Sequence, residues 1–207
     1  NVFSEVKSDC TYSPISFLSI EKITNGLKPA SIGFKIMVGH AASPTANHAE
    51  LFEQLSRIGI NNNIVIPLEY GEAQYRLKIK QIASGLFPNQ VEFLENRLSM
   101  TEYYQKLSDI GFAVFNFRRQ EALGNILFLV WNGAKVFLND ASSVYKQFKI
   151  WGLTVFSISS DLNKNQFEEL LSPDEASRNK KILENLFSEN KVKKYWEVLM
   201  RQESACS

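Results

Sequence analysis

Short apolar runs alternate with amphipathic segments along most of the chain, and this alternation predicts strands separated by helices. Six runs have the length of strands and are expected at residues 34–38, 64–68, 91–94, 112–115, 134–138 and 154–158. Helical spacing is expected at residues 45–57, 73–84, 99–107, 124–131, 142–151, 163–171, 173–187 and 189–200. The pattern predicts an α/β fold, with a doubly wound, mostly parallel, Rossmann-like sheet and terminal helices.

Local signals set several of the expected helix ends. Gly85 is expected to stop the helix at 73–84, because glycine is common just after a helix. Ser99 and Glu102 have the spacing of a capping box, which opens a helix. Pro173 suits the first turn of a helix, where its missing N–H group is not needed.

The chain is expected to divide into three parts. Residues 1–30 carry turn signals such as Ser13-Pro14 and Asn25-Gly26, and are interpreted as a linker or the remnant of a preceding domain. Residues 31–162 hold the alternating strands and helices and form the α/β domain. Residues 163–207 form terminal helices that pack on the sheet or on a domain outside this sequence. The chain starts without Met, so it is expected to belong to something longer.

Composition excludes several classes of protein. The 44% hydrophobic and 22% charged residues are ordinary for a globular domain. Lys+Arg 23 against Asp+Glu 22 leaves a net charge of +1, so no nucleic-acid partner is expected. Cys10 and Cys206 are the only cysteines and lack zinc spacing, which favours a reducing, cytoplasmic setting without a metal site. No apolar run reaches the roughly 18 residues of a membrane span.

The stretch at 112–138 combines a strand, a polar insert, an apolar helix and a second strand. The connecting segment is long enough to return over the sheet, so a parallel pair of strands with a right-handed crossover is expected. The polar insert at 116–121 then lies at the carboxyl end of a strand. Open α/β sheets bind their ligands at that edge.

Residue types in the insert favour an anion site. Gly124 and Asn125 lie where the apolar helix begins, and a helix start stabilises an anion such as phosphate. Arg118 and Arg119 offer guanidinium groups that match phosphate oxygens. Glu121 would accept hydrogen bonds from sugar or ribose hydroxyls. The alternative is a solvated ion-pair cluster of little energetic weight.

A second loop of interest follows the strand at 34–38. His40 comes directly after Gly39 and is a candidate proton carrier, because histidine titrates near neutral pH. The alternative is a solvated histidine or one that binds a backbone carbonyl. His48 is expected to cap or pack with Asn47. The loop lacks the G-x-G-x-x-G spacing, which disfavours a dehydrogenase.

Tyr70 follows the strand at 64–68 at the same edge. Its ring could stack on a base, or its hydroxyl could donate to a phosphate. It could also seal the next helix onto the sheet. The residues alone leave these alternatives open.

Four stretches also carry a resemblance to a known family: IMVGHAASPTANHAELFEQL, IVIPLEYGEAQY, GFAVFNFRRQEALGNILFLVWNGAKVFLN and LTVFSISSDL. In order and with near-constant spacing, they resemble the carboxyl-terminal half of the lipid II Fuc4NAc transferases. This is the 4-alpha-L-fucosyltransferase family, glycosyltransferase family 56. The resemblance covers residues 30–165.

The resemblance implies a two-domain GT-B enzyme of which this chain is the donor-binding half. The implied reaction moves a Fuc4NAc-like deoxyamino sugar from a nucleotide diphosphate, thymidine-linked, to a lipid-linked saccharide in the synthesis of an enterobacterial common antigen-like polysaccharide. The implied partner is an amino-terminal acceptor domain or partner chain, and the implied place is the inner face of the cytoplasmic membrane. Neither a cofactor nor a divalent metal is implied, since helix dipoles and basic side chains stabilise the departing diphosphate.

The resemblance and the residue types together give one expected site. His40 and Glu121 are the catalytic candidates, although the family tends to have Asn at the first position and an amide at the second. The donor-binding residues are expected to be Gly39, His40, Ala41, Tyr70, Arg118, Arg119, Gln120, Glu121, Gly124 and Asn125. The alternative function is a non-catalytic Rossmann-like interaction module that holds a partner with its aromatic residues and terminal helices.

Overall fold

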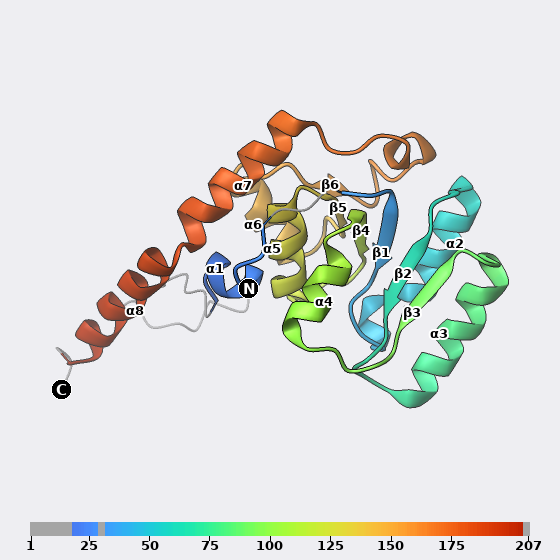
Figure 1. Ribbon diagram of the computed structural model, residues 1–207, viewed down its shortest axis with the longest axis horizontal. Helices are drawn as coiled ribbons and strands as arrows, with labels where there is room; N and C mark the ends of the chain where they lie inside the picture. The colour runs from blue at the N-terminus through green and yellow to red at the C-terminus, as the bar shows by residue number, and fades with distance from the viewer. Residues whose placement is uncertain (1–17, 29–31, 205–207) are drawn as a thin grey trace.

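The structure is a computed structural model that describes residues 18–28 and 32–204. The turn expected at Ser13-Pro14 and both cysteines lie outside these ranges. The described part contains one six-stranded sheet of order β3-β2-β1-β4-β5-β6, and every neighbouring pair is parallel (Figure 1). The strands are β1 Lys35–Val38, β2 Ile64–Pro67, β3 Val91–Leu94, β4 Ile110–Phe115, β5 Lys135–Leu138 and β6 Phe156–Ser157. The predicted doubly wound α/β fold is confirmed.

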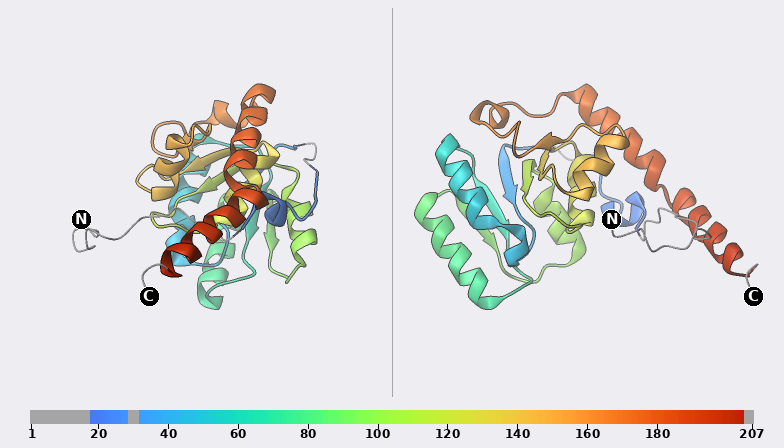
Figure 2. Two further views of the ribbon diagram at one scale, coloured as in Figure 1. Left: turned by 90° about the vertical axis from the view of Figure 1, so that its left-hand side faces the viewer. Right: turned by 180° about the vertical axis from the view of Figure 1, so that it is seen from behind.

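Helices cover both faces of the sheet (Figures 1 and 2). One face packs against α2 (His48–Ile58) and α3 (Ala73–Leu86). The other face packs against α1 (Ile20–Thr24), α4 (Met100–Leu107), α5 (Leu123–Asn132), α6 (Ser143–Ile150) and α7 (Pro173–Phe187). The last helix, α8 (Glu189–Ser204), projects away from the sheet beyond α7. The 3-10 turns are η1 (Pro44–Ala46) and η2 (Lys164–Phe167).

The strands are apolar because both faces of the sheet are buried. In β4, Phe112 and Val114 point into the core under α2 and α3, whereas Ala113 and Phe115 point into the core under α5. All six residues of this strand are buried, and it pairs with β1 on one side and β5 on the other. The expected parallel crossover from β4 through α5 to β5 is confirmed, and it fixes the polar insert at the carboxyl edge.

The strand order changes direction between β1 and β4. The chain leaving β1 runs toward β2, and the chain leaving β4 runs toward β5. Connections that diverge in this way open a crevice at the carboxyl ends of the two strands, which is where such sheets bind ligands. The loop after β1 and the loop after β4 therefore meet at this crevice.

The capping signals are confirmed at two helices. Ser99 Oγ accepts from the backbone N–H of Glu102, and the Glu102 carboxylate accepts from the backbone N–H of Ser99 at 2.9 Å. The same reciprocal pair, between Ser172 and Glu175, opens α7 with Pro173 in its first turn. Each pair satisfies two backbone donors that the helix leaves unpaired.

The expected stop at Gly85 is wrong. Helix α3 continues through Gly85 to Leu86, and Phe87 is its C-cap residue. Phe87 is buried and stacks edge to face with Phe52 of α2, at a ring distance of 6.0 Å. Burial of this ring holds the last turn of the helix onto the core and overrides the local preference of glycine.

Replacing Gly85 by alanine is expected to stabilise the protein. The residue lies inside the helix, and no atom lies within 4 Å of an added Cβ. Alanine loses less backbone entropy than glycine on folding, so the free energy of unfolding should rise by about 0.5–1 kcal/mol. Urea unfolding followed by circular dichroism measures this rise, and a lower unfolding free energy would contradict the open surroundings of this position.

The helix expected at 163–171 is also wrong, because the structure has only η2 there. The ammonium of Lys135 on β5 is the cause. It donates to the backbone carbonyls of Gln166, at 3.1 Å, and Glu169, at 2.7 Å. Phe167 inserts between Phe112 and Phe137, with ring distances of 5.3 and 5.2 Å. These contacts with a distant strand take carbonyls that a longer helix would use.

Candidate functional site

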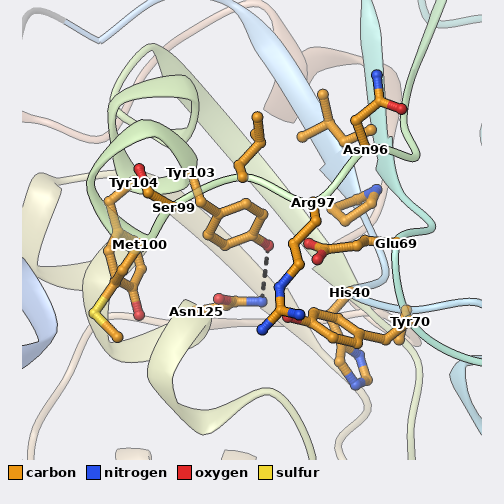
Figure 3. A pocket seen from close by; sticks show the side chains of 14 residues that line it. His40, Glu69, Tyr70, Asn96, Arg97, Ser99, Met100, Tyr103, Tyr104 and Asn125 are labelled. Carbon is orange, nitrogen blue, oxygen red and sulfur yellow. Dashed lines mark hydrogen bonds between the residues drawn. The ribbon is translucent and has the colours of Figure 1, made fainter.

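A cavity of about 650 Å³ opens at the carboxyl ends of β1, β2 and β3, beside the crevice (Figure 3). Helix α4 and the first turn of α5 complete its wall. Its lining residues are His40, Ala41, Pro67, Glu69, Tyr70, Leu94, Asn96, Arg97, Leu98, Ser99, Met100, Tyr103, Tyr104 and Asn125. The volume falls in the usual range for small-molecule sites, and the lining mixes aromatic rings with a few polar groups as such sites do.

Four of the expected site residues line this cavity: His40, Ala41, Tyr70 and Asn125. The remaining six lie outside the lining: Gly39, Arg118, Arg119, Gln120, Glu121 and Gly124. Glu121 still reaches the loop after β1, and a Cβ on Gly124 would lie 3.5 Å from the hydroxyl of Tyr104. The arginines extend on the exposed side of the β4–α5 loop.

His40 lies at the junction of the cavity and the crevice. Its Nε2 is 3.7 Å from a carboxylate oxygen of Glu121, and its ring meets Phe117 edge to face at 5.9 Å. Its Nδ1 is buried and has no hydrogen-bond partner among the described residues. Burial lowers the pKa of His40, and the negative charge of Glu121 offsets only part of this shift. The imidazole is therefore neutral near pH 7 and can accept a proton.

Glu121 links the two loops of the crevice. One carboxylate oxygen accepts from Arg119 Nε at 2.7 Å, and the other accepts from the Thr45 hydroxyl at 3.0 Å. Burial alone would raise the pKa of Glu121, but the hydrogen bonds from Arg119 and Thr45 outweigh burial and lower it. The carboxylate is ionised and largely buried, whereas the side chain of Arg119 is 73% exposed. Arg119 thus pairs with Glu121, as in the ion-pair alternative, but the carboxylate of this pair is largely buried rather than solvated.

The first turn of α5 has no side-chain cap. Its N-cap residue, Ala122, has φ 54°, in the left-handed region. The other non-glycine residues with positive φ in the described ranges are all asparagines, which tolerate this conformation better than alanine. The uncapped start leaves the backbone N–H groups of the first turn without a side-chain acceptor, and such groups favour an anion. Helix α2 also starts without a side-chain cap, at Asn47 with φ 51°.

Asn116 ties the start of α2 to the ends of β4 and β5. Its backbone carbonyl accepts from the Asn47 side chain at 2.8 Å, and its amide donates to Glu50 at 3.0 Å. Its side-chain oxygen accepts from Asn139 at 2.7 Å. Asn116 is buried, so these bonds satisfy a polar group that would otherwise be costly. These hydrogen bonds fix the start of α2 to the ends of β4 and β5.

His48 packs under the loop after β1, and its ring contacts are with Phe52 and Tyr75, whereas the side chain of Asn47, the expected partner, donates to Asn116. The side chain is fully buried, stacks near Phe52 and Tyr75, and places Nδ1 3.4 Å from the Tyr75 hydroxyl. Burial, and to a smaller extent the neighbouring His40, lowers the pKa of His48 to about 4. His48 is a neutral core residue whose ring lies directly against Gly39.

Tyr70 is 63% exposed at the rim of the cavity, so the interpretation that it seals α3 onto the sheet is wrong. The backbone explains why the ring turns outward. Ala42 donates its N–H to the carbonyl of Tyr70, and Gly71 forms a β-bridge with Ala42. This bridge joins the loops after β1 and β2 and leaves the Tyr70 ring free to contact a ligand.

Sequence reasoning missed the side of the cavity built from the end of β3 and from α4. Tyr103 accepts a hydrogen bond from Asn125 at 3.1 Å, and the guanidinium of Arg97 reaches across the cavity toward this pair (Figure 3). The Glu69 carboxylate is directed into the same space. The capping box at Ser99 was the available signal, because it places the first turn of α4 at the ligand edge.

No three His, Cys, Asp or Glu side chains of residues 18–28 and 32–204 gather so that they could hold a metal ion. Among the helices of the same ranges, none has the length and apolarity to cross a bilayer.

The six parallel strands, their order and the crevice between β1 and β4 define one Rossmann-like half of the GT-B glycosyltransferase fold. A family model described as 4-alpha-L-fucosyltransferase, glycosyl transferase group 56, matches residues 3–203. The chain therefore belongs to this family, and the suspected resemblance is confirmed.

Solved structures share the fold at low sequence identity. The N-terminal domain of Candida albicans trehalose-6-phosphate phosphatase has a TM-score of 0.67 at 12% identity over 94% of this chain and 49% of its own. AviGT4, a glycosyltransferase involved in avilamycin A biosynthesis, has a TM-score of 0.56 at 12% identity over 84% and 51%. HepE from Anabaena, in complex with UDP and glucose, has a TM-score of 0.57 at 16% identity over 84% and 48%. The chain thus spans about half the length of each.

Proposed function

We propose that the chain is the donor-binding part of a glycosyltransferase that moves a Fuc4NAc-like deoxyamino sugar from a nucleotide diphosphate, thymidine-linked, to a lipid-linked saccharide. Membership of group 56 supports glycosyl transfer. The fold shared with HepE, described in complex with UDP and glucose, supports a nucleotide donor. The product belongs to the synthesis of a cell-surface polysaccharide resembling enterobacterial common antigen.

The uncapped start of α5, beside the cavity, is the observation that carries this proposal. Its uncapped N–H groups and helix dipole favour an anion, and the left-handed backbone of Ala122 is the kind of local strain that is common at functional sites. A diphosphate placed there would have Arg118 and Arg119 on its solvent side. When the bond to the sugar breaks, negative charge develops on the departing diphosphate, and fixed donors stabilise that charge most.

His40 and Glu121 are the catalytic candidates of this proposal. His40 is neutral near pH 7, and its Nε2 faces the Glu121 carboxylate at 3.7 Å. A hydrogen on Nε2 would be attracted by this carboxylate, which leaves the lone pair of Nδ1 to accept a proton. Glu121 then orients the imidazole and helps to position the sugar.

The remaining parts of the reaction are assigned to groups outside the cavity. We propose that an amino-terminal domain or a partner chain supplies the acceptor site, since the chain spans about half of the structures it matches. The lipid-linked acceptor places the assembly at the inner face of the cytoplasmic membrane. No cofactor or divalent metal is needed in this proposal, because the α5 start and the arginines stabilise the diphosphate.

Isothermal titration calorimetry of the 207-residue chain with TDP, in the presence of excess EDTA, tests the proposal. We expect saturable binding, and about tenfold weaker binding for the variant Gly124→Val. Valine would place methyl groups between the first turn of α5 and the Tyr104 hydroxyl, 3.5 Å from its Cβ, and obstruct the approach of a phosphate.

Gly85→Val in α3 is the matched control, because it makes the same change in a helix where the added atoms meet no neighbour. It should bind TDP as the unmodified chain does. Absence of binding of both TDP and UDP at millimolar concentration would contradict the proposed function. Binding that appears only after Mg²⁺ replaces EDTA would contradict its metal-free part.

A further inference from the structure

A chain of hydrogen bonds joins the loop after β1 to the residue that precedes the start of α5. The Thr45 hydroxyl donates to Glu121 Oε2 at 3.0 Å, and the hydroxyl oxygens of Thr45 and Ser43 lie 2.7 Å apart. A carboxylate only accepts and a threonine hydroxyl has one hydrogen, so Ser43 donates to Thr45 and Thr45 donates to Glu121. The chain therefore has one direction, and it ends on the carboxylate oxygen that lies 3.7 Å from His40 Nε2.

The two hydroxyls are not used by the turn that carries them. Ser43 is the N-cap residue of η1, where a serine often accepts from a backbone N–H, but its side chain forms no such bond. Thr45 lies inside η1, and a backbone hydrogen bond from Ala46 to Ser43 closes the turn without the Thr45 side chain. The hydroxyls instead contact a carboxylate 76 residues away in the sequence.

The two oxygens of the Glu121 carboxylate have different tethers. Oε1 accepts from Arg119 Nε at 2.7 Å, and the Arg119 side chain is 73% exposed. A long, exposed side chain loses entropy when it is held in one geometry, so this tether is weak. Oε2 accepts from Thr45, whose short side chain comes from a turn closed by backbone hydrogen bonds. Thr45 is therefore the firmer of the two tethers.

We propose that Thr45 is a positioning residue that holds Oε2 of Glu121 against the imidazole of His40. The Nε2 hydrogen of His40 is then attracted to Oε2, and Nδ1, which has no partner among the described residues, keeps its lone pair for a proton. Without Thr45, Arg119 would draw the carboxylate toward solvent. The proposal rests on the proposed function, because it adds Thr45 to the site of the two catalytic candidates.

The charge that acts on His40 comes from Glu121. Burial lowers the pKa of His40, and the carboxylate of Glu121 opposes this shift. His48 of α2 is a second titratable neighbour, but it is neutral near pH 7 because its pKa is about 4. The other charged or titratable side chains that line the cavity with His40 are Glu69, Arg97, Tyr70, Tyr103 and Tyr104 (Figure 3). Movement of Glu121 away from the imidazole should therefore lower the pKa of His40 further.

An NMR titration of the histidine side chains in the 207-residue chain tests the proposal. The chain has only two histidines, and the variant His48→Asn assigns their signals. In Glu121→Gln, the pKa of His40 should decrease, because an amide carries no charge. Thr45→Val should reproduce the greater part of this decrease. Thr45→Ser keeps the hydroxyl and should return the pKa of His40 to its value in the unmodified chain.

Thr154→Val is the matched control, because it removes a threonine hydroxyl that accepts from Arg178 at 3.1 Å outside the cavity lining. It should leave the pKa of His40 unchanged. An unchanged or raised pKa of His40 in Thr45→Val overturns the positioning role. So do nitrogen chemical shifts that place the hydrogen of neutral His40 on Nδ1 in the unmodified chain.

These titrations need no nucleotide, so the two proposals fail in different experiments. Absence of TDP and UDP binding by the unmodified chain overturns the proposed function, and with it the use of Thr45 in that reaction. A failed histidine titration with intact TDP binding overturns the role of Thr45 alone.

Discussion

Replacing Gly39 by alanine is expected to lower the free energy of unfolding by about 3 kcal/mol. Gly39 ends β1 with φ +67°, and an alanine in this left-handed conformation is strained. Its Cβ would also overlap Nε2 of His48 and lie 2.9 Å from Cδ2. The imidazole cannot move aside, because it is fully buried between Phe52 and Tyr75. Urea unfolding of both proteins measures the loss.

Gly59→Ala separates the two causes of this loss. Gly59 has φ +69°, close to the value at Gly39, but no atom lies within 4 Å of an added Cβ. It should therefore show only the cost of the left-handed backbone, about 1 kcal/mol. Equal losses in the two variants would mean that the close approach of His48 to the loop after β1 contributes nothing.

The sequence was sufficient to predict the sheet because its signals are local. Apolar runs of strand length and helices of matching period decide the βα order, and the length of the β4–α5–β5 crossover decides that these strands are parallel. Helix α7 has the predicted bounds, since Ser172 and Glu175 cap it and Pro173 starts it. The capping residues and apolar runs lie within, or within a few residues of, the helices and strands that they determine.

The two wrong helix predictions, at 163–171 and at Gly85, have causes that lie outside the local sequence. The helix expected at 163–171 is short because Lys135, on another strand, binds its carbonyls, and no local pattern contains this information. Gly85 stays helical because Phe87 packs on Phe52. In both cases a tertiary contact overrides a local preference.

The position of the candidate site on the sheet could be predicted, but the side chains that line its inner wall could not. The carboxyl ends of β1, β2 and β4 follow from the fold, and His40, Tyr70 and Asn125 do line the cavity. The direction of a side chain does not follow from the fold. Arg119 turns to Glu121, and Tyr103 comes from a helix whose face toward α5 depends on packing. Such pairings are decided by groups that are far apart in the sequence.

Acidification from pH 8 to pH 5 is expected to cost the protein about 2 kcal/mol of stability through His48 alone. The pKa of His48 is about 4 in the folded state and 6.5 in an unfolded chain. Between these values the unfolded state binds more protons, so stability falls as the pH falls. The full contribution is present above pH 6.5. His40 acts in the same direction, because burial also lowers its pKa.

Urea unfolding at pH 8 and pH 5 of the unmodified chain and of His48→Asn measures this contribution. Asparagine keeps a polar atom near the Tyr75 hydroxyl, which lies 3.4 Å from Nδ1, but does not titrate. The loss of stability on acidification should therefore be about 2 kcal/mol smaller in the variant. His40→Asn, which removes the histidine nearer to the solvent, should keep most of the loss. An equal loss in His48→Asn would mean that the buried imidazole is protonated in the folded protein, and the close packing of His48 under Gly39 would then be wrong.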